Sequence, residues 1–185
     1  MKEEVPIKYQ EIKDQLLNNM DENHTSVFKT DLKSLTDLEF FECHLDELQF
    51  LEDCENLKNL FFHNSLQRRP LQTLPRLPKL NSLGIAGECV KNLSFLDSCP
   101  NLEELYLAST GLVDISPVNQ LTKLKKLSLD NMNIRGFEKL NQLDTVVELS
   151  LMGISRKNVP FHKFPNVKKL SCREVDFRNF APLFK

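Results

Sequence analysis

The chain has 185 residues, with 26 acidic and 24 basic side chains, a formal net charge of −2 and a mean hydropathy of −0.34. No run of the sequence approaches the roughly 18 consecutive apolar residues of a membrane span. The small lysine clusters lack the basic excess and the stacking aromatic residues that are typical of nucleic-acid binding. We therefore expect a protein that binds neither a membrane nor a nucleic acid.

The charge is unevenly distributed along the chain. Residues 1–60 hold 15 acidic and 6 basic side chains, which leaves 11 of the 26 acidic and 18 of the 24 basic side chains for residues 61–185. Ordinary solvated surface is the favoured explanation. The alternative is electrostatic orientation of a partner, which would change the association rate more than the affinity.

The first predicted element is a helix over residues 7–20. Its apolar residues Ile7, Ile12, Leu16, Leu17 and Met20 follow a loosely helical spacing, which favours an amphipathic capping helix. The next segment, SVFKTDLKSL, has the pattern of a repeat that lacks its own strand. Residues 1–34 are thus predicted to form an N-terminal helical cap with a lead-in segment.

Seven similar segments then follow one another. They begin at residues 35, 57, 80, 102, 124, 146 and 167, so successive copies are 22, 23, 22, 22, 22 and 21 residues apart. In the copy LKKLSLDNMNI, the central LSL alternates apolar and polar residues and predicts a very short strand. No copy can bury its leucines alone, so stacking of neighbours is expected to form one continuous core over residues 35–177.

This pattern resembles that of the leucine-rich repeat family, L-x-x-L-x-L-x-x-N/C-x-L. The segments LVDISPVNQLTKLKKLSL and LSFLDSCPNLEELYL are similar to the short repeats of protein-phosphatase regulatory subunits and internalins. The resemblance implies an α/β solenoid: a right-handed horseshoe or arc with a parallel sheet on its concave face and 3₁₀ or irregular turns on its convex side. Residues 178–185 are expected to be a short C-terminal cap or a truncated continuation, with Phe177, Phe180, Leu183 and Phe184 available for either role.

Some positions depart from the family pattern. The ninth position, which is usually Asn, holds Cys43, Ser65, Glu88, Thr110, Met132, Ile154 and Val175. A hydrogen-bonded ladder at this position is therefore doubtful toward the C-terminus, where drier turns are expected. The segment QRRP at residues 67–70 adjoins the single 23-residue spacing and predicts a local loop or bulge.

The five cysteines are far apart in the sequence and form no C-x-x-C pair. Their odd number favours reduced thiols and a cytoplasmic, intracellular location, because no apolar signal segment precedes them. Export to a host cell by a route that needs no cleaved signal is the alternative. Cys43 and Cys172 fall on repeat positions and are predicted to be small core residues.

The candidate site is the concave face of the predicted sheet. With core residues at repeat positions one, four and six, positions three, five, seven and eight face outward. Rings gather at Phe41, Phe61, His63 and Tyr106, above a low floor of Gly84, Ala86, Gly87, Ala108 and Ser109. The predicted protein-binding residues are Phe41, Phe61, His63, Tyr106, Asp130, Met152, Arg173, Glu39, Glu104 and Lys126.

An alternative interpretation exists for the two Phe pairs, Phe40–Phe41 and Phe61–Phe62. They could pack beneath the N-terminal cap, and a register shift of one residue would exchange the buried and exposed rings. The charges at position three, Asp37, Glu104, Lys126, Glu148 and Lys169, are expected to form a rim, for which a merely solvated role is favoured.

No catalytic, cofactor or metal constellation is evident. The four histidines are isolated from one another and from cysteines at metal-ligand spacing. The segment GIAG lacks the spacing of a phosphate loop, and close backbone approach is the preferred explanation of its glycines. Asp144 and Glu148 would form an acid–base pair only on a helix, whereas the repeat places Glu148 at the start of a strand.

We therefore predict a non-enzymatic module that binds another protein on its concave face and needs no cofactor. A regulatory or effector role, in which the module targets or inhibits a specific enzyme, is one alternative. The other is a structural protein that self-assembles through the solenoid ends. A monomer is expected, with end-to-end association as the competing possibility.

Overall fold

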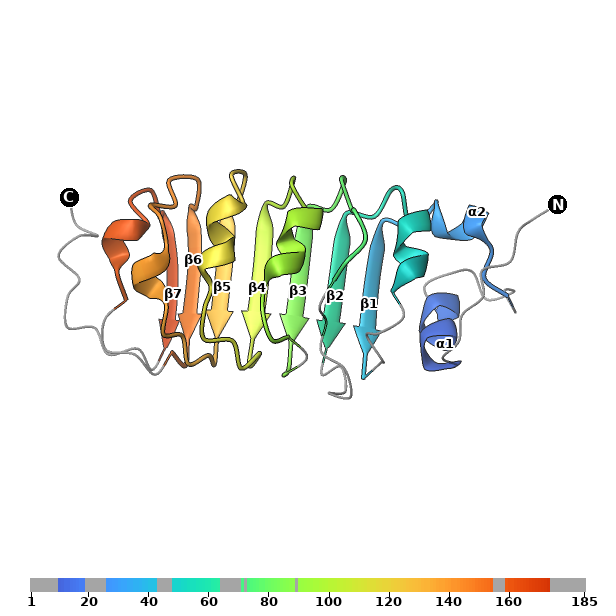
Figure 1. Ribbon diagram of the computed structural model, residues 1–185, viewed down its shortest axis with the longest axis horizontal. Helices are drawn as coiled ribbons and strands as arrows, with labels where there is room; N and C mark the ends of the chain where they lie inside the picture. The colour runs from blue at the N-terminus through green and yellow to red at the C-terminus, as the bar shows by residue number, and fades with distance from the viewer. Residues whose placement is uncertain are drawn as a thin grey trace.

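The structure is a computed structural model that describes residues 10–18, 26–42, 48–63, 71, 73–88, 90–154 and 159–173. Seven parallel strands lie in one sheet in the order of the sequence. They are β1 (Asp37–Phe41), β2 (Asn59–His63), β3 (Ser82–Ala86), β4 (Glu104–Ala108), β5 (Lys126–Asp130), β6 (Glu148–Met152) and β7 (Lys169–Arg173). Figure 1 shows this row of strands running along the molecule, with α1 near β1 at one end.

Every return segment except the one between β2 and β3 contains a described short 3₁₀ helix, and these helices lie on one side of the sheet (Figure 1). They are η1 (Gln49–Asp53), η2 (Ser94–Ser98), η3 (Ser116–Gln120), η4 (Phe137–Lys139) and η5 (Phe161–Lys163). This arrangement confirms the predicted solenoid, with its parallel sheet and its 3₁₀ turns. Glu148 begins β6, as the repeat predicts, so it does not face Asp144 across a helical turn.

The core lies between the sheet and the 3₁₀ helices. The repeat residues at positions one, four and six are buried in all described copies from the first to the sixth, because alternate strand residues point to the same side. Phe40 and Phe62 are fully buried and stack on each other, with ring centroids 5.7 Å apart. Phe41 and Phe61 point to the other side, so the predicted register is confirmed.

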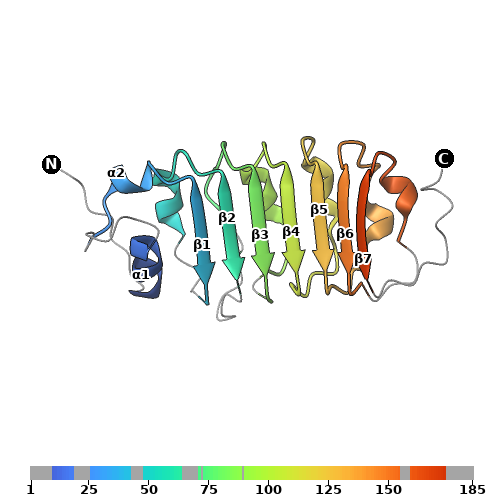
Figure 2. The same ribbon diagram turned by 180° about the vertical axis from the view of Figure 1, so that it is seen from behind.

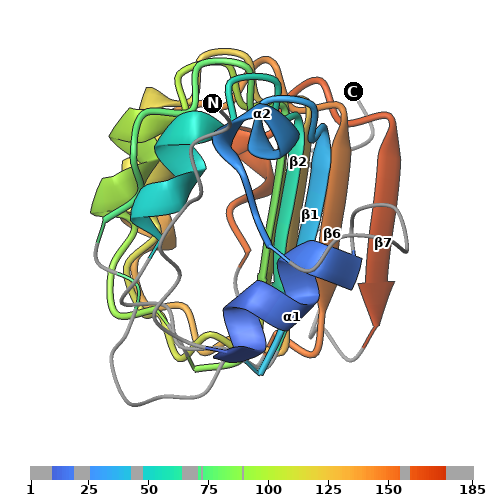
Figure 3. The same cartoon turned by 90° about the vertical axis from the view of Figure 1, so that its right-hand side faces the viewer.

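The N-terminal helix α1 (Gln10–Asn18) covers the β1 end of the core, as Figure 3 shows from that end. Ile12 and Leu16 are fully buried there. The side-chain amide of Gln15 accepts a hydrogen bond from the Phe41 N–H and donates one to the Phe41 carbonyl, both at 2.7 Å. This amide therefore satisfies backbone groups at the edge of the sheet in the way that another strand would. Ile7 and Met20, which were included in the predicted helix, lie outside the described residues.

A second helix, α2 (Lys29–Leu32), follows in the lead-in segment, where Val27, Leu32 and Leu35 are buried. At the far end, Cys172 was predicted to be a core residue, but it is half-buried and packs against the core from its edge. The predictions for Cys43, for residues 67–70 and for the C-terminal residues 178–185 fall outside the described residues.

Side-chain hydrogen bonds form a ladder between the turns of neighbouring copies. The residues that form this ladder are not those of the ninth repeat position. Asn56, Asn101 and Asn166 each precede the first apolar residue of a copy, and each donates to a carbonyl of the preceding copy at 2.6–2.7 Å. Lys79 and Lys123 occupy the same position in intervening copies and donate to Asn56 and Asn101. Side chains one repeat apart thus satisfy turn backbone groups along much of the solenoid.

The ninth position itself is dry toward the C-terminus, as predicted. Met132 and Ile154 are core residues that are 2% and 1% exposed. Thr110, which could have formed hydrogen bonds, is also buried, and its hydroxyl oxygen has no hydrogen-bond partner in the described structure. The hydrogen-bonded ladder is therefore formed by the residue before the first apolar residue of a copy, and not by the ninth position that the family pattern uses.

Candidate functional site

The candidate site is the open face of the sheet, which consists of the outward residues of β1–β7. No helix in the described part of the chain lies over this face, as Figure 2 shows from that side. Because neighbouring strands are in register, residues at each repeat position form a row across the sheet. The row at position five contains Phe61, Gly84 and Tyr106, and the row at position seven contains Phe41 and His63.

Four rings form a chain over β1–β4. Phe41 and His63 are stacked, with centroids 4.7 Å apart and planes inclined by 11°. His63 and Phe61 are inclined by the same angle at 6.2 Å. Phe61 and Tyr106 lie 5.8 Å apart with a tilt of 41°. These separations are in the range of favourable aromatic pairs, so the rings hold one another in place.

Gly84 explains how Phe61 and Tyr106 meet, although β3 separates their strands. A Cβ atom added at Gly84 would overlap the Phe61 ring, so the ring lies directly over this residue. The sequence prediction of close backbone approach at GIAG is thus wrong for Gly84, because a side-chain ring is the close neighbour. Gly87 serves a different purpose, since its φ of 99° lies in the left-handed region that glycine adopts without strain.

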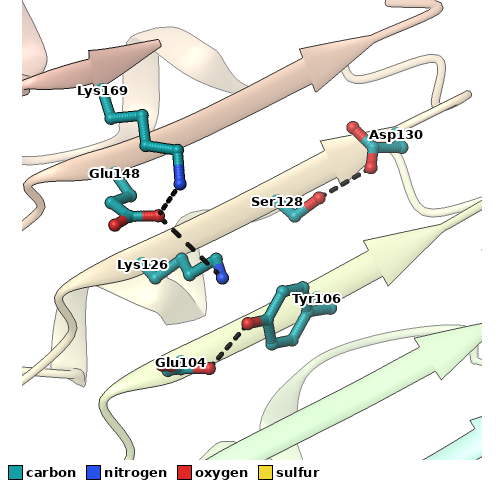
Figure 4. A network of polar contacts seen from close by, with 7 residues as sticks. All are labelled: Glu104, Tyr106, Lys126, Ser128, Asp130, Glu148 and Lys169. Carbon is teal, nitrogen blue, oxygen red and sulfur yellow. Dashed lines mark hydrogen bonds and ion pairs between the residues drawn. The ribbon is translucent and has the colours of Figure 1, made fainter. Parts of the chain in front are cut away.

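The aromatic chain continues into charged residues over β4–β7 (Figure 4). The Tyr106 hydroxyl donates a 2.6 Å hydrogen bond to Glu104, and the Lys126 ammonium lies 5.0 Å from the Tyr106 ring centroid. Burial and the Glu104 hydrogen bond raise the pKa of Tyr106. The contact with Tyr106 and the nearby carboxylates raise the pKa of Lys126, so this ammonium stays charged beside the ring.

Glu148 lies between two lysines of adjacent strands. Its carboxylate is 3.9 Å from the Lys126 ammonium and 3.2 Å from that of Lys169. Glu104, Lys126, Glu148 and Lys169 alternate in sign along the row at position three, since β4–β7 are neighbours. Glu148 is thus paired with lysines of both neighbouring strands, but all three side chains stay at least partly exposed, so the solvated role favoured by the sequence analysis stays a prediction.

Asp130 organises the polar half of the open face. Its carboxylate accepts hydrogen bonds from Ser128 Oγ at 2.7 Å, Ser150 Oγ at 3.0 Å and the Met152 N–H at 3.0 Å. The residues around it line a shallow hollow of ≈ 290 Å³, bounded by Tyr106, Lys126, Glu148 and Lys169. This hollow is lined in part by Tyr106, the last ring of the aromatic chain.

The ten predicted site residues all lie on strands of the open face, but they form two groups. Glu39, Phe41, Phe61, His63, Glu104, Tyr106 and Lys126 are linked through the ring chain and its charged neighbours. Asp130 and Met152 share the hydrogen bond near the hollow, and Arg173 lies at the end of β7. The sequence analysis assigned Glu148 and Lys169 only to the rim, and it did not include them or the serine row among the protein-binding residues, although they line the hollow.

The thiols and the potential metal ligands are placed as follows. Cys54 and Cys99 are buried in the core, and burial raises the pKa of each thiol to about 12. Within the described ranges, no three His, Cys, Asp or Glu side chains are grouped so that they could hold a metal ion. None of the helices in these ranges combines the length and apolar character needed to cross a membrane.

The fold is that of a leucine-rich repeat solenoid, which confirms the resemblance found in the sequence. The family profile described as Leucine Rich repeats (2 copies) matches residues 100–150. No curated protein sequence matches the chain. Proteins with this fold are typically non-enzymatic modules that bind other proteins.

Among solved structures, internalins of Listeria monocytogenes are similar in fold. InlP superposes with a TM-score of 0.72 at 17% identity, over 89% of this chain and 51% of that one. An internalin, inlF, gives 0.54 at 20% identity, over 94% and 45% of the two chains. Internalin C2 gives 0.58 at 18% identity, over 95% and 88%. The chain thus spans about half the length of the first two structures.

Proposed function

We propose that the protein is a binding module that holds a partner protein on the open face, with the ring chain as the centre of contact. The observation that carries this proposal is the presence of four adjoining rings on a face of the sheet that no described helix covers. Phe41 is 54% exposed, although a ring of this size gains free energy when it is buried. Exposed aromatic clusters mark interaction sites, and tyrosine is frequent among residues that dominate binding energy.

The face is suited to binding because it is already ordered. Phe41, His63, Phe61 and Tyr106 contact one another, and each projects from a strand that is hydrogen-bonded within the sheet. The small side chains of Ala86 and Ala108 leave space beside the rings for a side chain or loop of the partner, whereas Gly84 is covered by the Phe61 ring. Association would therefore require little ordering of this chain, which favours affinity.

We also propose that the protein works in a reducing, intracellular compartment. Cys54, Cys99 and Cys172 are free thiols, and the first two are buried among apolar side chains. Labelling with a thiol reagent under denaturing conditions, with and without prior reduction, measures their state. Equal labelling in both samples supports the proposal, whereas labelling that requires reduction contradicts it.

The experiment that tests the binding proposal is quantitative affinity capture from a cell extract. The unaltered chain is compared with a Phe61→Ser/Tyr106→Ser variant, after both have been shown to have equal thermal stability. Val113→Ser serves as the control, because Val113 is an exposed apolar residue outside the strands. A Gly84→Ala variant provides a second test, since it displaces the Phe61 ring without removing any aromatic group.

A partner that is retained by the unaltered chain and by the control, but is weakened more than tenfold by the ring variant, supports the proposal. Gly84→Ala should weaken the same partner. Equal retention of the partner by all four proteins contradicts the proposal and indicates that the binding surface lies away from the rings. Capture of only the protein itself, with an apparent size that grows with concentration, favours self-assembly instead.

A further inference from the structure

The ring-bearing half of the open face carries an unusual charge pattern. The outward residues of β1–β4 at positions three, five, seven and eight include four carboxylates and, among the described residues, no lysine or arginine. The carboxylates are Asp37, Glu39, Glu42 and Glu104. The corresponding residues of β5–β7 include three cations and two carboxylates, namely Lys126, Lys169, Arg173, Asp130 and Glu148. The aromatic half is therefore acidic, and its polar neighbour is close to neutral.

We propose that this acidic aromatic half receives a basic segment of the partner, with an arginine or lysine side chain laid on the rings. The inference rests on the proposed protein-binding function and adds the chemistry of the partner. Its basis is charge complementarity: four carboxylates lie on the ring-bearing strands or at their ends, two of them in contact with the rings, and both carboxylates and π-systems attract cations.

The geometry around Glu39 fits such a side chain. The Glu39 carboxylate lies 3.8 Å from His63 Nε2, and the His63 ring is stacked on Phe41. The Glu39 side chain is 56% exposed, so its oxygens are accessible from the face that the rings present. An arginine could therefore stack its planar guanidinium on an exposed ring and donate two hydrogen bonds to the adjacent carboxylate.

The protein already holds one of its own cations in a similar way. The Lys126 ammonium lies over the Tyr106 ring, and Glu104 accepts the hydrogen bond of the same tyrosine. Ring, carboxylate and cation thus occur together at the boundary of the two halves. At Phe41 and Glu39 the ring and the carboxylate are present, and the partner would supply the cation.

Other occupants suit this surface less well. An acidic segment would be repelled by the four carboxylates, and like charges brought together at an interface weaken it. A purely apolar segment could cover the rings, but it would remove water from Glu39 and Glu104 without giving them a new partner. A second copy of this chain would present the same acidic half to its own counterpart in a symmetric contact.

A defined peptide tests the inference on the full chain. The probe is a capped twelve-residue peptide with three arginines separated by Gly and Ser, and its neutral counterpart contains citrulline in place of each arginine. The face variant is Glu39→Gln/Glu104→Gln, which preserves hydrogen bonding and the rings. The matched control is Asp97→Asn/Glu138→Gln, which removes two exposed carboxylates from η2 and η4 on the other side of the sheet.

Binding is followed by amide NMR shifts at low and moderate salt. We expect the arginine peptide to shift Glu39, Phe61 and Gly84, with an affinity that falls at least tenfold in the face variant and is unchanged in the control. Binding should weaken as salt rises, and the citrulline peptide should bind at least tenfold more weakly. Equal affinity for face variant and control, equal binding of the citrulline peptide, or shifts confined to other surfaces would each overturn the inference.

The two proposals fail in distinguishable ways when the captured partner is tested against the same variants. Loss of the partner with the ring variant and with the face variant supports both. Loss with Phe61→Ser/Tyr106→Ser, but retention with Glu39→Gln/Glu104→Gln, leaves the protein-binding site in place and shows that the partner is not held by its positive charge. Retention of the partner by both variants contradicts the proposed binding site on the rings.

Discussion

A single carboxylate, that of Asp130, replaces part of the sheet's backbone pairing. The register between β5 and β6 ends at Ser128 and Ser150, whereas β4 and β5 pair over all five residues. Beyond that point, the Met152 N–H donates to Asp130 Oδ1 rather than to a strand carbonyl. Asp130 therefore adds a side-chain link between the two strands, next to the main-chain hydrogen bond from the Asn131 N–H to the Met152 carbonyl.

We expect Asp130→Ala to lower the free energy of unfolding by about 1–2 kcal/mol, because the backbone N–H of Met152 and two serine hydroxyls lose their acceptor. Urea unfolding measures the change. Asp130→Asn should lose less, since its amide oxygen can still accept one or two of these bonds. An alanine variant as stable as the unaltered chain would show that water replaces the carboxylate without cost.

A second residue-scale prediction concerns pH. The ion pair with Lys139 and the hydrogen bonds from Ser116 lower the pKa of Asp114 from its usual 3.8 to about 2. Its contribution to stability is therefore fully present above about pH 4 and is lost as the pH falls toward 2. The carboxylate is largely exposed, so solvent screening keeps this contribution below about 1 kcal/mol.

Asp114→Asn should accordingly be less stable than the unaltered chain at pH 6 and equally stable near pH 2. Urea unfolding at a series of pH values gives the difference. High salt at pH 6 should reduce it, because the Lys139–Asp114 pair is on the surface. A difference in the free energy of unfolding that does not vary with pH would mean that the ion pair contributes nothing and that the Asn side chain destabilises the protein for another reason.

Residue positions on the open face were predictable from the repeat, but their interactions were not. Phe40 and Phe41 are the same residue type, and only strand alternation decides that one is buried and the other exposed. The contact of Phe61 with Tyr106 depends on the absence of a side chain at Gly84, which a row-by-row comparison of neighbouring strands could have suggested. The Asn and Lys ladder was not predicted, because the family pattern places its hydrogen-bonding residue at the ninth position.

At the scale of elements, the strand ends share one backbone conformation. Glu42, Gly87, Ser109, Asn131 and Gly153 occupy position eight, and all have positive φ. Each N–H donates to the carbonyl at position seven of the next copy, at 2.6–3.0 Å. The left-handed residue thus turns the chain out of the strand while it extends the hydrogen-bonded ladder by one residue.

Gly153→Ala tests this turn. Its φ of 63° is strained for alanine, and the added Cβ would overlap Asn131 Oδ1 in the preceding copy. We expect a loss of about 1–3 kcal/mol in the free energy of unfolding. The double variant with Asn131→Gly should recover the part due to the overlap. Additive effects in this double-mutant cycle would contradict the proposed contact.

Strands were the most predictable elements, since the alternation of core residues recurs at each copy and fixes their register. The 3₁₀ helices were predicted as a class but not in their bounds. Asn92 and Asp114 begin two of them by accepting hydrogen bonds from the N–H groups of Ser94 and Ser116, two residues later. This local signal occurs in only two described copies, so periodicity alone does not reveal it.

At the scale of the whole molecule, the interactions between strands are linear, because every strand pairs only with the strands of the copies before and after it. Its stability should therefore be a sum over copies and their interfaces. Leu38 of β1 and Leu127 of β5 are both fully buried, so they allow matched substitutions at the end and near the middle.

We expect Leu38→Ala and Leu127→Ala each to cost about 2–5 kcal/mol locally. Native-state hydrogen exchange should detect faster exchange mainly in β1 and β2 for the first variant, and across β4–β6 for the second. A chemical probe of β6 should respond to Leu127→Ala but not to Leu38→Ala. Uniform acceleration over all seven strands in both variants would contradict this description and would indicate one all-or-none unit.

The sequential order of the strands also bears on how the protein is made. Each strand finds its neighbour only 21–23 residues earlier in the chain, as in the pairing of Asn59 with Asp37 and of Ser82 with Asn59. A nascent polypeptide can therefore dock each new copy soon after that copy leaves the ribosome, without waiting for distant segments. The same locality means that duplication or loss of one copy in a gene would lengthen or shorten the sheet by one strand while preserving the contacts of the others.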